Sequence, residues 1–135
     1  MAATPANKLS IFYKDIDLGL RAHPVTGALL TKKNAESVKQ GVRNLILTNY
    51  YERPYLPDYG GNIRQHLFEL FDVGTVQDVE RDIEYAFNSY IKRAELIEAN
   101  VTADVDGNAL TITIVFRPIN SVKPEEVTVT VERIR

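Results

Sequence analysis

The sequence predicts an α+β domain in which three helices pack on a small antiparallel sheet, a C-terminal three-stranded meander. Apolar residues recur at helical spacing over residues 34–92 and alternate with polar residues from residue 97 onward, and helices followed by strands are typical of this class. The length of 135 residues fits one domain with its own core. We expect residues 11–135 to form that domain and residues 1–10 to form a flexible arm.

A short hairpin is expected ahead of the first helix. Residues 15–18 lead into it, residues 25–28 supply the turn, and Leu29 and Leu30 lie on its far side. The apolar segment 11–13 would pin the arm to the domain or to a partner.

The first helix is followed by a loop rich in proline and tyrosine. Asn34 is the expected N-cap of this helix, and its buried stripe is Ala35, Val38, Val42, Leu45 and Ile46. Residues 50–61 then hold four of the seven tyrosines, two prolines and two closing glycines. Proline fixes φ and lacks an amide hydrogen, so this segment is a stiff loop. Its composition leaves two interpretations open, a cover over the core or a docking surface with tyrosine and arginine as anchors.

Two more helices precede the sheet. A short one is expected over residues 63–71 and ended by Gly74, and Thr75 is expected to cap the next. The long helix turns one apolar side inward and a polar side outward. Its inward residues are Val76, Val79, Ile83, Ala86, Phe87 and Tyr90.

The last third of the chain alternates apolar and polar residues with the period of strands. Three strands are expected, over residues 97–105, 110–116 and 127–131, with a turn at 106–108. The last strand ends the meander and so is expected at a sheet edge, where an unpaired strand invites pairing with another chain. Strand addition by a partner is one interpretation; the other is an interior strand covered by the N-terminal segment.

Composition argues against several classes of function. The 16 basic and 18 acidic residues give a net charge of −2, which does not favour nucleic-acid binding or attraction to anionic membranes. The chain has no cysteine, and its two histidines, His23 and His66, are far apart in sequence, so no metal site and no cofactor are expected. No apolar stretch is long enough to span a bilayer.

No catalytic constellation stands out. The serines lack a glycine-flanked elbow, and phosphate-binding glycine signatures are missing from the sequence. Four acidic residues flank the tyrosine-rich loop, namely Glu52, Asp58, Glu69 and Asp72. A pair of carboxylates could cleave a glycosidic bond, but solvated carboxylates are the simpler interpretation of each.

The order of segments resembles the T4-type phage baseplate wedge and sheath-initiator family, often labelled "lysozyme-like" and related to the TssE protein of type VI secretion. The run 53–60, Arg-Pro-Tyr-Leu-Pro-Asp-Tyr-Gly, resembles the Arg-Pro-aromatic-x-Pro-acid-aromatic-Gly segment of that family. The segments 65–69, 75–84 and 13–17 are similar to its Gln-x-Leu-Phe-Glu, Val-Glu-Arg-x-Ile-Glu and Tyr-x-Asp-Ile-Asp segments.

This resemblance implies a structural subunit of a contractile tail baseplate rather than an enzyme. Its fold would resemble the strand-exchange domain of the sheath protein, and its sheet would template sheath polymerisation by strand addition. The expected pairing residues are Val127, Thr128, Val129, Thr130 and Val131. The alternative is a peptidoglycan-cleaving glycosidase of the tail.

The resemblance also implies partners and a location. The partners would be the core bundle of the larger wedge proteins, the tail sheath protein and the tube or hub proteins. Six copies would assemble per baseplate in the host cytoplasm, in a phage, a tailocin or a secretion machine. The family's Glu-Pro-Arg docking motif is here Ile91, Lys92 and Arg93, so only the arginine is retained. The expected docking residues are Arg93, Lys92, Arg53, Pro54, Tyr55, Pro57, Tyr59 and Gly60.

Overall fold

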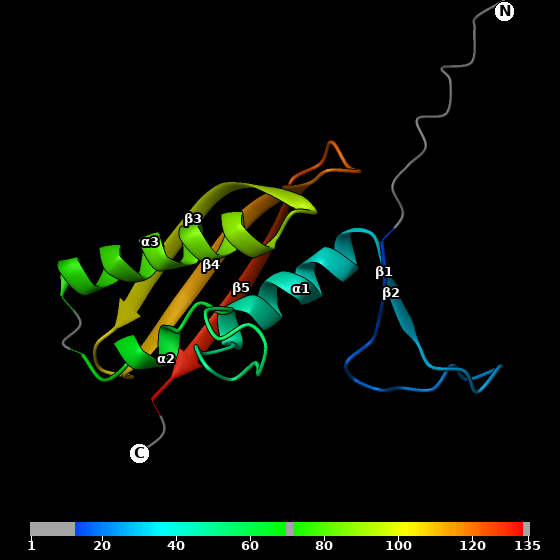
Figure 1. Ribbon diagram of the computed structural model, residues 1–135, viewed down its shortest axis with the longest axis horizontal. Coiled ribbons are helices and arrows are strands. Elements are labelled where there is room, and N and C mark those ends of the chain that lie inside the picture. The colour runs from blue at the N-terminus through cyan, green and yellow to red at the C-terminus, as the bar shows by residue number, and fades with distance from the viewer. Residues whose placement is uncertain (1–12, 70–71, 134–135) are drawn as a thin grey trace, which may run out of the picture.

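The computed structural model describes residues 13–69 and 72–133, and it has the predicted α+β architecture (Figure 1). The expected arm, the segment 11–12, Leu70 and Phe71 lie outside the described residues. The elements in chain order are β1 (Lys14–Ile16), β2 (Thr31–Lys33), α1 (Ala35–Leu47), α2 (Ile63–His66), α3 (Val73–Tyr90), β3 (Ala94–Asp104), β4 (Ala109–Pro118) and β5 (Glu125–Glu132).

The helices cover one face of the antiparallel sheet β3-β4-β5. Alternate residues of β4 and β5 turn toward them and are buried, as the period of the sequence predicts. The helices contribute the expected residues to the same core, including Val38, Val42, Val79, Ile83 and Phe87. The opposite face of the sheet carries mainly threonine and charged side chains.

The predicted hairpin is confirmed. Strands β1 and β2 pair antiparallel, and a bridge between Ala22 and Leu29 extends the hairpin toward its turn. The amide of Gly27 donates to the carbonyl of His23 at 2.9 Å, and Gly27 has a φ of 67° that suits glycine.

Of the two predicted helix caps, one is correct in position and the other is wrong. Asn34 is the N-cap residue of α1, but its side chain makes no capping hydrogen bond, because its Oδ1 accepts hydrogen bonds from the amide of Tyr13 and from Nδ2 of Asn120. Thr75 lies inside α3, where its amide donates to Oδ1 of the N-cap residue Asp72 at 2.8 Å.

The boundaries of two elements also differ from the prediction. Helix α2 ends at His66, and Gly74 lies inside α3 rather than between helices. Strand β3 has a bulge between Leu96 and Glu98, which shifts the register and leaves Ile97 exposed. One apolar face therefore does not run unbroken from Ile97 to residue 105.

Candidate functional site

The outer edge of β5 pairs with no other strand among the described residues. In the order β3-β4-β5, strand β5 pairs only with β4. Its last hydrogen bond, from the amide of Arg133 to the carbonyl of Asn108 at 3.0 Å, sets the phase of the ladder. Hydrogen-bonded and non-hydrogen-bonded pairs alternate in antiparallel strands. The amides of Val127, Val129 and Val131 therefore point to β4, and those of Thr128 and Thr130 point outward.

The side chains of β5 alternate between the core and the open face of the sheet. Val127, Val129 and Val131 are buried in the core, whereas Thr128 and Thr130 are exposed on the open face of the sheet. The two threonine hydroxyls each lie 3.4 Å from a threonine hydroxyl of β4, as expected for the closer, non-hydrogen-bonded pairs. The structure thus divides the predicted pairing segment 127–131 into core residues and edge residues.

The other edge of the sheet is protected. The carboxylate of Glu80 in α3 accepts the amide hydrogen of Val101 in β3 at 3.2 Å. The bulge in β3 further interrupts the regular ladder on that side. Bulges and covering elements are devices that block edge-to-edge pairing. Of the two edges, β5 is therefore the one suited to receive another strand.

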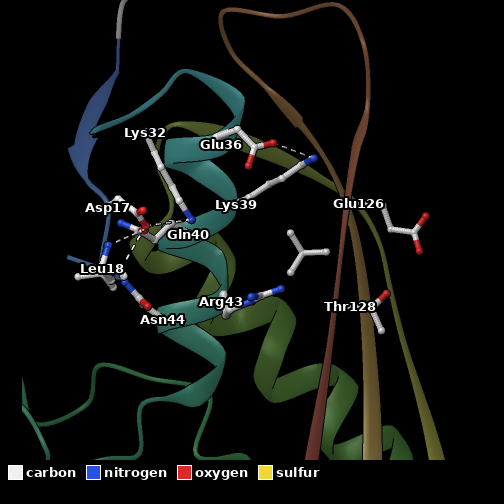
Figure 2. Close-up of a pocket in the computed structure, with 12 residues that line it drawn as sticks. Asp17, Leu18, Lys32, Glu36, Lys39, Gln40, Arg43, Asn44, Glu126 and Thr128 are labelled. Carbon is white, nitrogen blue, oxygen red and sulfur yellow. Dashed lines mark hydrogen bonds and ion pairs between the residues drawn. The ribbon is translucent and has the colours of Figure 1, made fainter. Parts of the chain in front are cut away.

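Two grooves follow the β5 edge. The first, of about 520 Å³, lies between residues 126–128 of β5, the α1 side chains from Glu36 to Asn44, and the hairpin (Figure 2). The second, of about 370 Å³, continues past Leu47, Arg64 and Phe68 beside residues 130–133. Neither groove is lined by a residue of β3 or β4, so both lie outside the sheet.

Polar contacts fasten the walls of the first groove. Lys39 of α1 forms an ion pair with Glu125 at 2.7 Å, and this hydrogen bond raises the pKa of Lys39. Gln40 donates to the carbonyl of Ile16 at 2.8 Å and accepts from the amide of Leu18 at 3.3 Å. These bonds hold the hairpin, α1 and the start of β5 together around the groove.

Arg93 is engaged inside the domain. Its Nη1 donates to Oδ2 of Asp15 at 3.0 Å and to Oγ of Ser37 at 3.1 Å, and its guanidinium lies 5.5 Å from the ring centroid of Tyr13. A Cβ on Gly41 would come within 2.8 Å of Nη2 of Arg93, so a larger residue there would displace the guanidinium. Lys92, beside it, is exposed and donates to the carbonyl of Asn88.

The tyrosine-rich loop has a packed base and an exposed tip. At its base, Tyr59 packs edge-on against Tyr90 at 5.0 Å between ring centroids, and the guanidinium of Arg53 lies 4.3 Å from the Tyr59 ring. Gly60 has a φ of 131° and touches the backbone of Thr48. At its tip, Tyr55 is 95% exposed and lies beside Pro54. The base of the loop thus packs on the domain, as the first interpretation predicts, and docking through the exposed tip stays a prediction.

The acidic residues around the loop have local partners. Glu52 accepts two hydrogen bonds from Asn49, which lower its pKa. The hydrogen bond that the amide of Thr75 donates to Asp72 lowers the pKa of Asp72. Glu69 contacts His66, whose other ring nitrogen lies 3.1 Å from Asp82. Across residues 13–69 and 72–133, no group of three acidic or histidine side chains could hold a metal ion, and no helix could span a membrane.

Sequence reasoning missed the residues that frame the grooves and the Arg93 cluster. Asp15, Ser37 and Arg93 come from three distant segments, so no local pattern pairs them. Glu80 lies on the polar side of α3, and helical periodicity alone does not pair it with the backbone of β3. A usable signal for the groove did exist: Glu36, Gln40, Arg43 and Leu47 recur at helical spacing on one side of α1.

Comparison with known proteins gives concordant matches. The family described as "Baseplate wedge protein gp25" matches residues 32–120. Baseplate wedge protein gp25 of Enterobacteria phage T4 is 32% identical over 85 residues, which are 63% of this chain and 64% of that protein. The match therefore spans less than two thirds of the T4 protein, and the family match ends before β5.

Solved structures share the fold at low sequence identity. A putative tail lysozyme from Geobacter sulfurreducens has a TM-score of 0.65 at 20% identity, covering 74% of this chain and 91% of that chain. A chain of the anti-feeding prophage baseplate has a TM-score of 0.62 at 19% identity, covering 88% and 84%. A chain of the post-contraction pyocin R2 baseplate has a TM-score of 0.52 at 18% identity, covering 84% and 97%. Because the family match covers most of the domain, this chain belongs to the gp25 family of baseplate wedge proteins.

Proposed function

We propose that the chain is a structural subunit of a contractile tail baseplate and that its β5 edge templates the sheath by accepting a strand. The observation that carries this proposal is the set of outward amides at Thr128 and Thr130, which lie beside open grooves. Two further observations support this proposal. The chain belongs to the wedge family, and the protected β3 edge leaves β5 as the edge for an incoming strand. The incoming strand would belong to the tail sheath protein.

A second surface would dock the subunit on the larger wedge proteins. The exposed tip of the loop at Pro54 and Tyr55 and the neighbouring Arg53 offer side chains of the kinds that anchor interfaces. Lys92 is exposed and available, whereas Arg93 serves mainly to hold the domain together. Six copies per baseplate, contacts with tube or hub proteins and assembly in the host cytoplasm belong to the same proposal.

A proline substitution tests the template. In Thr128→Pro, the lost amide hydrogen points away from β4, so the domain should fold while one donor for the incoming strand disappears. Electron microscopy of tails carrying this variant should reveal baseplates with few sheathed tubes. Normal sheath growth on these tails would overturn the template role.

Two controls sharpen this test. Thr128→Ala keeps the amide and should leave sheath growth unchanged. Ala103→Pro places the same residue on the protected β3 edge, where the ladder phase also turns the amide outward, and it too should leave sheathing intact. Thermal unfolding of each purified variant establishes that it is folded.

The docking surface needs its own test. Tyr55→Ala should reduce the amount of this subunit in purified baseplates without changing its thermal stability, because Tyr55 is almost fully exposed. Tyr59→Ala should lower the stability, since Tyr59 packs against Tyr90. Unchanged incorporation of the Tyr55 variant would contradict docking through the loop tip.

Cleavage of peptidoglycan, suggested by the name of the Geobacter protein, is the weaker candidate. A general acid of a glycosidase needs a raised pKa. Glu52 and Asp72 have lowered pKa values, because hydrogen bonds from Asn49 and Thr75 favour their charged forms. Release of soluble fragments from purified cell wall, abolished by Glu69→Gln, would reverse this ranking.

A further inference from the structure

Three arginines along the β5 edge have no acidic partner among the described residues, although Glu36 and Glu126 also line the first groove. Arg43, Arg64 and Arg133 line the two grooves, and all three are exposed. Within the part of the chain that the structure describes, none of them forms an ion pair. The other basic residues of the first groove, Lys32 and Lys39, are already paired with carboxylates.

Arg43 is the best placed of the three arginines. Figure 2 shows its side chain reaching from α1 toward β5, at the level of Thr128. A strand added to β5 would lie about 5 Å outside it. Alternate side chains of that strand would then face the helix layer, where Arg43 lines the groove without an ion pair to any described residue.

The second groove adds an apolar requirement. Leu47 is 40% exposed and Phe68 is 69% exposed, and both line this groove beside Thr130 and Val131. The guanidinium of Arg133 lies 5.1 Å from the centroid of the Phe68 ring, so its positive charge is at the same end of this groove. Apolar side chains on the helix-facing side of an added strand would cover these two residues.

The open face of the sheet favours different side chains on the added strand. Glu126, Thr128, Thr130 and Glu132 flank the edge there, and all four are exposed. Like charges directly opposite each other destabilise paired strands. Small polar residues therefore suit the open side of the added strand, and acidic residues do not.

We propose that the strand received at β5 is amphipathic in a defined sense. It carries an acidic residue opposite Arg43 and apolar residues over Leu47 and Phe68 on its helix-facing side, with small polar residues on the other. This inference rests on the proposed template function and deepens it, because it states which extended segments the edge selects. The edge selects a strand by the face that carries its acidic residue as well as by backbone pairing.

Synthetic strands test the selection on the purified full chain. One probe alternates threonine and valine and has a single central glutamate in place of a valine. The second probe has lysine at that position, and the third places the glutamate on the threonine face. Binding is measured by fluorescence anisotropy of labelled peptides at low and at high salt.

The first probe should bind about five- to tenfold more tightly than either of the others, because one pair changes from attraction to repulsion at a partly exposed site. In Arg43→Gln the preference for the first probe over the lysine probe should fall to within about twofold, and it should shrink at 1 M salt. Arg81→Gln, on the exposed side of α3, is the matched control and should keep the preference.

The outcomes separate this inference from the template function. Equal binding of the glutamate and lysine probes to the native chain, or a preference that survives Arg43→Gln, overturns the selection rule. Failure of all three probes to bind overturns it as well. The template function stands or falls separately, on whether tails carrying Thr128→Pro grow a sheath.

Discussion

Nη1 of Arg93 donates a hydrogen bond to Oδ2 of Asp15 at 3.0 Å, across 78 positions of sequence. Ser37 completes the contact, because its hydroxyl donates to the same oxygen of Asp15 at 2.5 Å and its Oγ accepts from Arg93. One cluster thereby joins the hairpin, the N-terminal half of α1 and the segment that enters β3. Of these three elements, the hairpin and α1 also line the first groove.

Arg93→Ala should destabilise the domain by about 1–2 kcal/mol, because two charge-assisted hydrogen bonds are lost at a site that is partly open to solvent. Urea unfolding followed by circular dichroism measures the change. Arg21→Ala is the matched control, since Arg21 is 74% exposed and its ion pair with Asp17 should contribute less. An unchanged midpoint for Arg93→Ala would mean that this residue is available for docking instead.

The same cluster predicts a response to acid. The hydrogen bond from Ser37, aided by Arg93 and opposed by burial, holds the pKa of Asp15 below its ordinary value of 3.8. A lowered folded-state pKa gives a stabilisation that is present above the unfolded pKa and is lost as pH falls through the folded value.

The stability difference between the native chain and Asp15→Asn should therefore be largest near neutral pH and shrink below about pH 3.8, the ordinary value for the carboxyl. Urea unfolding of both proteins over an acidic pH series checks this. A difference that stays constant across the series would contradict the assignment.

The stability that His66 contributes should fall as pH rises, which is the reverse of the prediction for Asp15. Burial opposes its charged form, but hydrogen bonds to Glu69 and Asp82 outweigh burial and raise its pKa above 6.5. A raised folded-state pKa gives a stabilisation that is complete below the unfolded value and is lost as pH rises through the folded value.

Replacing His66 by Gln should accordingly cost more stability at pH values below 6.5 than well above it. Thermal unfolding of the two proteins on either side of this value is the measurement. His23→Gln serves as the control, because His23 lies in the hairpin turn, where its ring accepts hydrogen bonds from backbone amides. A loss that grows with rising pH would refute the ion-pair role of His66.

Gly60→Ala should destabilise the domain by more than about 2 kcal/mol, since a φ of 131° excludes a side chain and a Cβ would meet the carbonyl oxygen of Thr48 at 2.2 Å. Gly27→Ala is the control. It also has a positive φ but nothing within 4 Å, so it should cost only about 1 kcal/mol. Equal losses in chemical denaturation would show that the close approach at Thr48 is unimportant.

The sequence by itself determined the class of fold, the hairpin turn, the core-facing residues of α1, α3, β4 and β5, and the terminal position of the last strand. These features follow from local periodicity, which repeats within a few residues and can be read from one segment at a time. The N-cap position of Asn34 is also correct, but its side chain bonds Tyr13 and Asn120 instead of a helix amide. Asp72 caps α3 in place of Thr75, and only the folded chain decides among such polar partners.

The tertiary structure alone decided which amides of β5 face outward, which edge is protected, and where Arg43 and Arg93 point. Each of these depends on the register of a neighbouring strand or on a helix from a distant part of the chain. Valine and threonine alternate along β5, but only the ladder phase set at Asn108 and Arg133 assigns the free donors to the threonines. A strand pattern states which side chains are buried, and it does not state toward which neighbour the backbone turns.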